Sequence, residues 1–340
     1  MLLAIESTCD ETAAAVIDRD ATVLGQCVAT QDKLHEPFRG VVPEIAARAH
    51  VERILPVVDT ALNRSGTWLS EIEYFAVADR PGLAGSLLVG VTAAKTLAVA
   101  TGKPLVTINH LHAHLYACQM ASDRSVYPSI GLVVSGGHTT LYRCDGPLEL
   151  TYLGGTIDDA IGEAFDKVAA MLNLGFPGGP AVSRWAANGR DDAYAFPRSM
   201  IDRDNDDFSF SGLKTAVRYA IVGDDVTRDP STVDVDDQTR ADVCASFERA
   251  AVDVVVHKCR RAIARNGLGT LIVGGGVAAN GALRKSLVAA GQDDGFDVVI
   301  APMSLCTDNA AMGAIAWRHI ERGEFSALDV DITPGLQRGF

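Results

Sequence analysis

The chain has 340 residues, 48% of them hydrophobic, and a net charge of −13. A chain of this length and apolar content can bury a large core and suits two domains better than one. Its acidic charge argues against a protein that binds nucleic acid through its overall field, so any RNA contact must be local or shared with a partner.

Membrane and export signals are not expected. The apolar run Leu87–Ala100 is interrupted by Gly90, Thr92 and Lys95, and it falls short of the about 20 residues that a membrane span needs. The N-terminus reaches Glu6 without a basic region, which argues against a secretory signal. The seven cysteines form no C-x-x-C pair and are typical of reduced core thiols. A cytoplasmic location is therefore predicted, with no membrane partner.

The first half of the chain predicts three strands, a long helix, and then strands and helices in alternation. The long helix has Pro43 in its first turn, where proline is favoured, and apolar residues such as Ile54 and Val58 at helical spacing. The predicted elements are strands Leu2–Ile5, Ala13–Ile17 and Thr22–Ala29, helix Pro43–Asn63, strand Tyr74–Ala78, helix Ser86–Ala100, strand Leu105–Ile108 and a helix from His110 onwards. Their order is βββαβαβα.

The second half repeats this order around an insertion at about 173–266, which contains a Gly/Pro segment, an acidic loop and a predicted helix at Thr239–Asn266. The other predicted elements are strands Ile130–Val134, Thr139–Arg143 and Glu149–Leu153, helix Asp158–Leu172, strand Thr270–Val273, helix Gly281–Ala290, strand Val298–Ala301 and helix Asp308–Glu321. Internal duplication is the simplest account, although repeated patterns also arise by chance in α/β proteins.

The repeat predicts an α/β fold of two duplicated actin-like (ASKHA) βββαβαβα halves around a central nucleotide- and metal-binding cleft. This is the architecture of actin, the sugar kinases and the Hsp70 ATPase. The predicted halves are residues 1–127 and residues 128–340, the second with the helical insertion at about 173–266. The strand-to-helix junction that ends each half would then face the cleft.

A candidate metal site begins with His110 and His114, which are four residues apart at the start of a predicted helix. Residues i and i+4 share one helix face, so both imidazoles can bind one ion, whereas His112 would point elsewhere. Asp308, at the equivalent place in the second half, supplies a third and harder ligand. The alternative is a pair of partly buried, hydrogen-bonded histidines. A zinc protease is not expected, because Leu111 stands where its H-E-x-x-H motif has glutamate.

Glycine-rich turns offer backbone N–H groups to a phosphate. Ser135, Gly136 and Gly137 join two predicted strands, and three glycines at 274–276 precede a helix, whose N-terminus favours anions. A plain hairpin explains any one such turn equally well. Asp166, on a predicted helix, is either a surface charge or a carboxylate that accepts hydrogen bonds from ribose hydroxyls.

Short motifs in order along nearly the whole chain indicate one family. They are Ile5–Thr12 (IESTCDET), Gly40–Glu44 (GVVPE), His110-x-x-x-His114, Ser135–Thr139 (SGGHT), Gly162–Lys167 (GEAFDK), Pro177–Pro180 (PGGP), Phe208–Thr215 (FSFSGLKT), Gly275–Asn280 (GGVAAN) and Cys306–Asn309 (CTDN). This set resembles the Kae1/Qri7/TsaD family of tRNA N6-adenosine threonylcarbamoyltransferases. Arg80 departs from the family, which usually has glycine there. It is either an added anion contact or, as we favour, a lineage difference. His112 is also additional, with no clear role.

The resemblance implies the site residues and the reaction. The implied metal ligands are His110, His114 and Asp308, and the implied adenylate contacts are Val133, Val134, Ser135, Gly136, Gly137, Asp166, Gly179 and Asn280. The implied metal is Fe²⁺, with Zn²⁺ as the alternative. The implied reaction transfers the threonylcarbamoyl group from threonylcarbamoyl-AMP to N6 of adenosine 37 in tRNAs reading ANN codons (t6A biosynthesis), releasing AMP. Asp10 and Glu11 are the nearest candidates for a base or for orienting groups.

Partners and alternatives follow from the same resemblance. The implied partners, besides tRNA and threonylcarbamoyl-AMP, are a shorter, inactive paralogue and a small P-loop ATPase. One alternative is a metal-dependent carbamoyltransferase that acts on another acceptor, although such relatives usually embed this unit in a longer chain. The other alternative is a non-catalytic actin-like ATP-binding scaffold, which would not need His110, His114 and Asp308 together.

Overall fold

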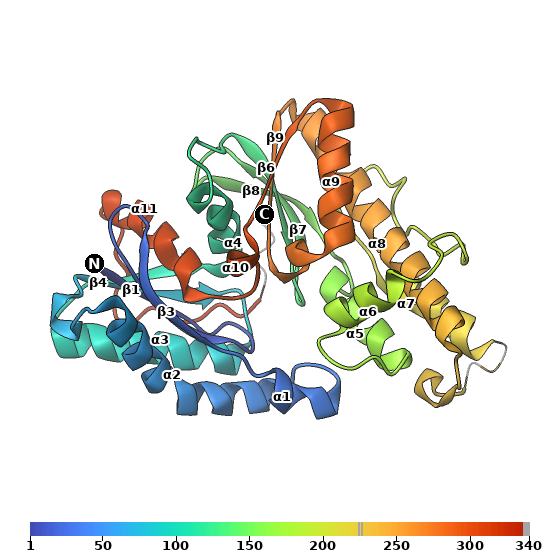
Figure 1. Cartoon of the computed structure of the whole chain (residues 1–340). Coiled ribbons are helices and arrows are strands. Elements are labelled where there is room, and N and C mark those ends of the chain that lie inside the picture. The colour runs from blue at the N-terminus through green and yellow to red at the C-terminus, as the bar shows by residue number, and fades with distance from the viewer. Residues whose placement is uncertain (224, 226, 336–340) are drawn as a thin grey trace. The chain divides into compact units, whose positions relative to one another are not determined.

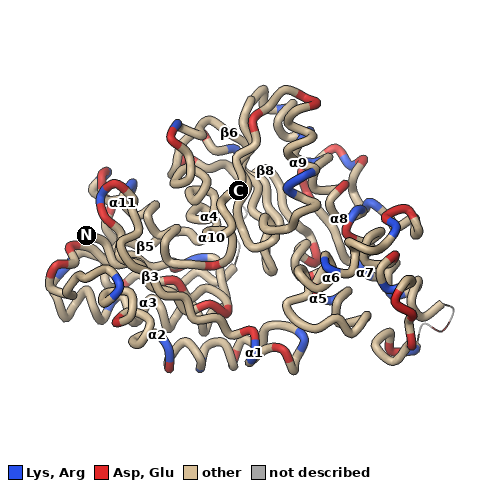
Figure 2. Tube along the Cα trace, viewed as in Figure 1, with Lys and Arg blue, Asp and Glu red and all other residues tan. Residues whose placement is uncertain are grey.

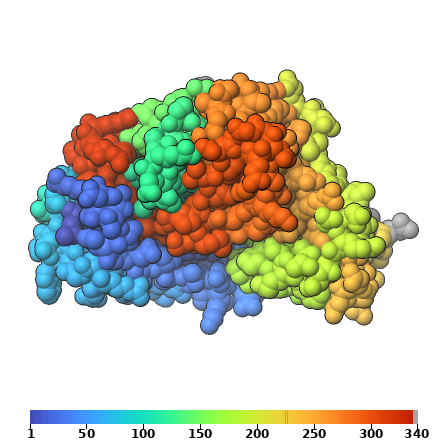
Figure 3. Space-filling model, turned by 45° about the horizontal axis from the view of Figure 1, so that its top comes forward, coloured from blue at the N-terminus to red at the C-terminus, as the bar shows by residue number. Residues whose placement is uncertain are grey.

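The computed structural model describes residues 1–223, 225 and 227–335, which form two compact units (Figure 1). Unit 1 comprises residues 1–125, 146–150 and 302–335, and unit 2 comprises the described residues of 126–145 and 151–301. The predicted halves, 1–127 and 128–340, divide the chain close to the first of these boundaries but differ over the segment 302–335, which packs in unit 1. In the space-filling view this segment, in red, lies beside the blue N-terminal segment (Figure 3).

Unit 1 is built on a mixed sheet of five strands in the order β3-β2-β1-β4-β5. β1 pairs antiparallel with β2 and parallel with β4, and β4 pairs parallel with β5. The strands are β1 (Leu2–Glu6), β2 (Thr12–Ile17), β3 (Val23–Ala29), β4 (Tyr74–Arg80) and β5 (Leu105–Asn109). The helices are α1 (Asp32–His35), η1 (Glu36–Phe38), α2 (Pro43–Ser65), η2 (Leu69–Glu71), α3 (Ala84–Thr101), α4 (His110–Met120), α10 (Met303–Cys306), η5 (Ala310–Ile315) and α11 (Ala316–Glu321).

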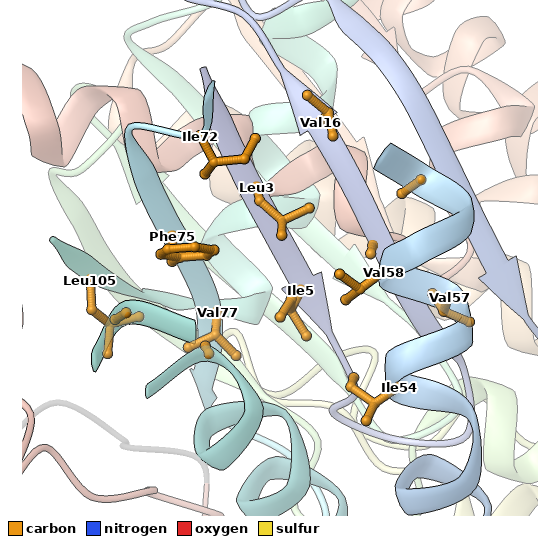
Figure 4. Packing of buried hydrophobic residues seen from close by; sticks show 14 of the residues in the cluster. Leu3, Ile5, Val16, Ile54, Val57, Val58, Ile72, Phe75, Val77 and Leu105 are labelled. Carbon is orange, nitrogen blue, oxygen red and sulfur yellow. The ribbon is translucent and has the colours of Figure 1, made fainter. Parts of the chain in front are cut away.

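Both faces of this sheet are covered. Successive residues of a strand point to opposite faces, so Leu3 and Ile5 of β1 join the core cluster that includes Ile54 of α2 (Figure 4). Ala4 faces the other side, where η5 approaches so closely that a Cβ added to Gly313 would lie 2.6 Å from the Cβ of Ala4. Burial on both faces explains why β1 and β2 are continuous apolar runs instead of alternating ones.

Unit 2 repeats this arrangement with a sheet in the order β10-β9-β6-β7-β8. β6 pairs antiparallel with β7 and parallel with β9, as β1 pairs with β2 and β4. The strands are β6 (Ser129–Val134), β7 (Thr139–Cys144), β8 (Leu150–Gly155), β9 (Thr270–Gly274) and β10 (Asp297–Ile300). The helices are α5 (Ile161–Met171), α6 (Gly178–Ala186), α7 (Ser211–Val222), η3 (Pro230–Thr232), α8 (Asp237–Asn266), η4 (Gly276–Ala279) and α9 (Gly281–Asp294). The matching strand order confirms the predicted duplicated α/β fold.

The predicted helix Asp308–Glu321 is wrong at its start. The chain forms the 3-10 helix η5 from Ala310 and the α-helix α11 only from Ala316. The side chain of Asn309 accepts a hydrogen bond from the backbone N–H of Met312 (3.3 Å) and therefore caps η5. This cap leaves Asp308 in the loop between α10 and η5.

One helix among the described residues, α3, is long and apolar enough to cross a membrane by length and composition alone. A core helix of a soluble protein meets the same criterion. α3 packs on β4 and α2, and its residues Leu87, Val91 and Ala94 are buried. These contacts are those of a helix that covers a sheet.

Candidate metal centre and nucleotide surface

The two histidines are positioned by the start of α4. The side chain of Asn109 accepts hydrogen bonds from the backbone N–H groups of Leu111 (2.9 Å) and His112 (3.3 Å), so the helix begins at His110. The rings of His110 and His114 lie 4.5 Å apart, centroid to centroid, and both side chains are buried. The i, i+4 spacing therefore places both imidazoles on one face of α4, as predicted.

Asp308 completes the group within unit 1. Its Oδ1 lies 3.0 Å from Nε2 of His114 and 3.5 Å from Nε2 of His110. One potential ligand atom from each of the three residues lies within 4.8 Å of the others. Two imidazole nitrogens and a carboxylate oxygen form a donor set that suits a divalent transition metal, so these residues fit the predicted ion.

Glu6 lies behind His110 and was not among the predicted site residues. Its Oε2 is 3.1 Å from Nδ1 of His110, and its Oε1 accepts a hydrogen bond from the backbone N–H of Thr8 (2.7 Å). Only 2% of Glu6 is exposed. A carboxylate at Nδ1 favours the tautomer with the proton on Nδ1, which leaves Nε2 able to bind a metal. The one sequence signal was a carboxylate at the end of an otherwise apolar strand.

The pKa values of the two histidines are shifted in opposite directions. Burial lowers the pKa of His110, but the carboxylates of Asp308 and Glu6 outweigh it and raise that pKa to about 9. Burial lowers the pKa of His114, and the charge of His110 adds to this effect. Nδ1 of His114 has no hydrogen-bond partner among the residues that the structure describes. Glu6 thus orients His110 through Nδ1, whereas the Nδ1 side of the His114 ring is held by packing alone.

The turn after β1 brings the two predicted acid–base candidates close to Asp308. The carbonyl of Cys9 accepts hydrogen bonds from Nε2 of His50 (3.0 Å) and Oγ of Ser86 (3.0 Å), which tie this turn to α2 and α3. Burial raises the pKa of Glu11 well above its usual value, and the charges of Asp308 and Asp10 raise it further. Glu11 therefore feels the negative charges of Asp10 and Asp308 within unit 1.

In unit 2, the turn between β6 and β7 leaves Gly136 and Gly137 exposed, and a Cβ added to either would meet no atom within 4 Å. The turn is closed by hydrogen bonds from the backbone N–H of Ser135 to the carbonyl of His138 (2.8 Å) and from the N–H of His138 to Oγ of Ser135 (3.1 Å). Val133 and Val134 are fully buried in the sheet. Of the predicted contacts in this turn, the glycine backbone is accessible, whereas the two valines could contribute only backbone atoms.

The other predicted adenylate contacts lie at helix starts of unit 2. Oδ1 of Asp166, on α5, accepts a hydrogen bond from the N–H of Gly178 (2.7 Å) and so holds the start of α6, beside Gly179. Asn280 caps α9, because its Oδ1 accepts from the N–H of Leu283 (2.8 Å). Its Nδ2 donates to other side chains of the unit, so Asn280 can offer a ligand only its remaining carbonyl lone pair.

Comparisons with known proteins decide the family. The model of a family described as "TsaD: tRNA N6-adenosine threonylcarbamoyltransferase" matches residues 22–315. A Rhodopirellula baltica protein named tRNA N6-adenosine threonylcarbamoyltransferase is 65% identical over 351 residues, which cover 100% of this chain and 98% of that protein. A protein of the same name from Anaeromyxobacter dehalogenans is 47% identical, with 98% of each chain covered. This chain belongs to the TsaD family.

Solved structures support the fold of this TsaD family member. Component A of (R)-2-hydroxyglutaryl-CoA dehydratase from Acidaminococcus fermentans matches with a TM-score of 0.55 at 11% identity, covering 94% of this chain and 98% of that one. Full-length HypF matches with a TM-score of 0.59 at 14% identity, covering 96% of this chain and 47% of that one. At such identities the likeness concerns the fold alone, and it confirms the predicted actin-like fold class.

The two departures from the TsaD family motifs lie next to the metal group. Nη1 of Arg80 forms an ion pair with the buried carboxylate of Asp79 (2.8 Å), so its charge already has a partner. Burial lowers the pKa of His112 to about 4, and the charges of Arg80 and His319 contribute to this shift. The ion pair with Asp79 agrees with the interpretation of Arg80 as a lineage difference.

Proposed function

We propose that this chain transfers the threonylcarbamoyl group from threonylcarbamoyl-AMP to N6 of adenosine 37 in tRNAs reading ANN codons, with release of AMP. One observation carries the proposal: a chain of the TsaD family, 65% identical over its whole length to a protein with this activity in its name, brings His110, His114 and Asp308 together. The alternatives, carbamoyl transfer to another acceptor and a non-catalytic scaffold, have no such support.

The three ligands of unit 1 are proposed to hold one Fe²⁺ ion, with Zn²⁺ as the alternative, since both metals accept imidazole and carboxylate ligands. His110, His114 and Asp308 would hold such an ion, and the chemistry that it would supply is Lewis-acid polarisation of a carbonyl of the threonylcarbamoyl group. The chain itself contributes the orientation of His110, through the hydrogen bond between Nδ1 and Glu6. Asp308 faces both imidazoles and sets the position of the site.

The residues of unit 2 are proposed to bind the adenylate. The exposed turn at Gly136 and Gly137 suits its phosphate, because these residues have no side chain to obstruct an approaching anion. Asp166, Gly179 and Asn280 are assigned to its nucleoside. The mixed anhydride is already activated, so the protein must chiefly position it and stabilise the charge of the departing AMP.

Proton transfer is assigned to the turn of Asp10 and Glu11. As N6 of the adenosine attacks, a bond forms between N6 and the carbamoyl carbon, the bond from that carbon to the phosphate oxygen breaks, and AMP leaves with the electron pair. The proton on N6 must go to a base. Glu11 is proposed for this role because it feels the charge of Asp308, and Asp10 is proposed because its own charge acts on Glu11.

Partners are proposed because the net charge of −13 opposes binding of the tRNA phosphates by this chain alone. Basic and acidic residues are interspersed along α8 (Figure 2). Within its cluster at 258–261, Lys258 is buried against the carbonyl of Asn205, and Arg260 and Arg261 pair with Asp294 and Asp206. We assign the missing tRNA surface to a shorter, inactive paralogue and a small P-loop ATPase. The cytoplasm is the proposed location.

Reconstitution tests the proposal directly. The metal-loaded chain is incubated with threonylcarbamoyl-AMP and an unmodified tRNA transcript, with and without the two partners, and the digested nucleosides are analysed by mass spectrometry. We expect t6A and an equal amount of AMP. A transcript with guanosine at position 37 and the Asp308→Asn variant serve as controls. Absence of t6A when metal, donor and both partners are present would overturn the proposal, and transfer from carbamoyl phosphate instead would favour the other carbamoyltransferase.

A further inference from the structure

Three helices of unit 2 bring together Ser183, Glu248 and Asn280. Ser183 lies on α6, Glu248 on α8, and Asn280 at the start of α9. Oγ of Ser183 donates a hydrogen bond to Oε1 of Glu248 (2.6 Å), and Nδ2 of Asn280 donates to the same oxygen (2.7 Å). Nδ2 of Asn280 also donates to Oγ of Ser183 (3.0 Å). The carboxylate of Glu248 is therefore anchored through one oxygen by two charge-assisted hydrogen bonds.

The second carboxylate oxygen of Glu248, Oε2, has no bonding partner among the described residues. Oε2 forms no hydrogen bond and no ion pair with any residue in the described part of the chain, although the side chain is half-buried. Oε2 is not among the fully buried side-chain atoms without a partner, so solvent or a ligand can reach it. Because Oε1 is fixed, Oε2 is pre-organised to accept a hydrogen bond from a ligand.

This carboxylate lies among the residues assigned to the nucleoside. Asn280 is one of them and contacts Glu248 directly. Gly179 precedes Ser183 by four residues on α6, so both lie on the same face of that helix. Asp166 holds the start of α6 through its hydrogen bond to Gly178. The position of Glu248 thus extends the proposed nucleoside surface, all within unit 2.

The unused polar atoms of this group are all acceptors. The hydroxyl hydrogen of Ser183 and the amide hydrogens of Asn280 are engaged, which leaves Oε2 of Glu248 and one lone pair each on Oδ1 of Asn280 and Oγ of Ser183. The vicinal hydroxyls of a ribose present two donors side by side. The edge of adenine, in contrast, presents its amine between two acceptor nitrogens. An acceptor-only surface is therefore complementary to the ribose and not to the base.

We propose that Glu248 is a specificity-determining residue that accepts hydrogen bonds from the ribose hydroxyls of the adenylate, with Ser183 and Asn280 as its positioning residues. This inference rests on the proposed function, since it requires an adenine nucleotide on unit 2. The negative charge of Glu248 would repel the phosphate, so it also directs the phosphate away from this end of the surface and toward backbone donors.

Calorimetric titration of the full metal-loaded chain with AMP, 2′-deoxy-AMP, 3′-deoxy-AMP and inosine monophosphate tests the inference. Glu248→Gln keeps an Oε1 that can accept from Ser183 and Asn280 but removes the charge and the acceptor at Oε2. We expect it to bind AMP about ten- to a hundredfold more weakly, the effect of losing a hydrogen bond to a charged group. The unmodified chain should lose a similar factor with at least one deoxy analogue, and Glu248→Gln should discriminate less between AMP and that analogue.

Two variants serve as comparisons. Asp293→Asn removes one negative charge from an exposed position of α9 and should bind AMP as the unmodified chain does. Ser183→Ala keeps the carboxylate but removes one anchor, so its loss of affinity should be smaller than that of Glu248→Gln. The analogue series on the unmodified chain needs no variant. It therefore tests whether the ribose hydroxyls contribute to binding even if Glu248→Gln fails to fold.

The outcomes separate this inference from the proposed function. If the unmodified chain binds AMP and both deoxy analogues equally well, or Glu248→Gln binds AMP normally, then Glu248 only supports the cap of α9 and the inference is wrong. If the affinity falls with inosine monophosphate instead, the carboxylate contacts the base, which also contradicts it. If no nucleotide binds to the unmodified chain, the proposed adenylate surface itself fails.

Discussion

Replacing Glu6 with glutamine should weaken metal binding, although Glu6 is not one of the three proposed ligands. Thr8 donates its backbone N–H to Oε1 of Glu6 (2.7 Å), so the glutamine oxygen must occupy that place. The amide nitrogen then faces Nδ1 of His110, where Oε2 now lies 3.1 Å away. An amide N–H donates to Nδ1 and drives the imidazole proton to Nε2, the atom that faces Asp308 and would bind the metal.

The expected loss is about ten- to a hundredfold in metal affinity, or ~1.4 to 2.8 kcal/mol, as is typical when a metal-ligating histidine loses the hydrogen-bond partner of its other ring nitrogen. The assay is anaerobic competition for Fe²⁺, and separately Zn²⁺, against a chromophoric chelator. His114→Ala and Asp308→Ala remove ligands and should abolish stoichiometric binding. Glu52→Gln, an exposed change of the same kind on α2, should leave the affinity unchanged.

The result that refutes this reasoning is a Glu6→Gln protein with a native melting temperature and the metal affinity of the unmodified chain. Glu6 would then have no influence on the tautomer of His110. Unchanged metal content in both His114→Ala and Asp308→Ala would go further and show that the assignment of the ligands is wrong.

Three further predictions concern other parts of the chain. Asp166→Ala should weaken adenylate binding about ten- to a hundredfold with metal content intact. Asp166→Asn can still accept a hydrogen bond from Gly178, so it should keep the fold and separate the structural role of Asp166 from its binding role. Unchanged affinity of both variants in calorimetry would mean that Asp166 is only a surface charge. The chain alone should bind tRNA weakly, and partners should strengthen the binding; tight, salt-insensitive binding in a filter assay without partners would contradict this. Burial lowers the pKa of His50, so as the pH falls below about 6.5 the unfolded chain takes up a proton first and stability is lost. Urea denaturation at several pH values should show a shallower loss in His50→Gln, and equal slopes would argue against the assignment.

The sequence by itself determined the parts of this protein that depend on local periodicity. The repeated order of strands and helices follows from runs of apolar residues, and the sheet orders of the two units confirm the duplication. The pairing of His110 and His114 could also be predicted from the sequence, because a spacing of four residues places two side chains on one face of any α-helix. Motif order along the chain was sufficient to identify the TsaD family.

Only the tertiary structure decided which distant residues meet. Glu6 and His110 are 104 residues apart, and His114 and Asp308 are 194 residues apart. Glu248 showed no signal at all, since a glutamate on a long helix is usually a solvated surface charge. The error at Asp308 has a local cause instead, because Asn309 caps η5 and so shifts its start beyond Asp308. The spacing of apolar residues indicates which face of a helix or strand is buried. The partner of a polar side chain depends instead on which helices and strands pack beside it in the folded chain.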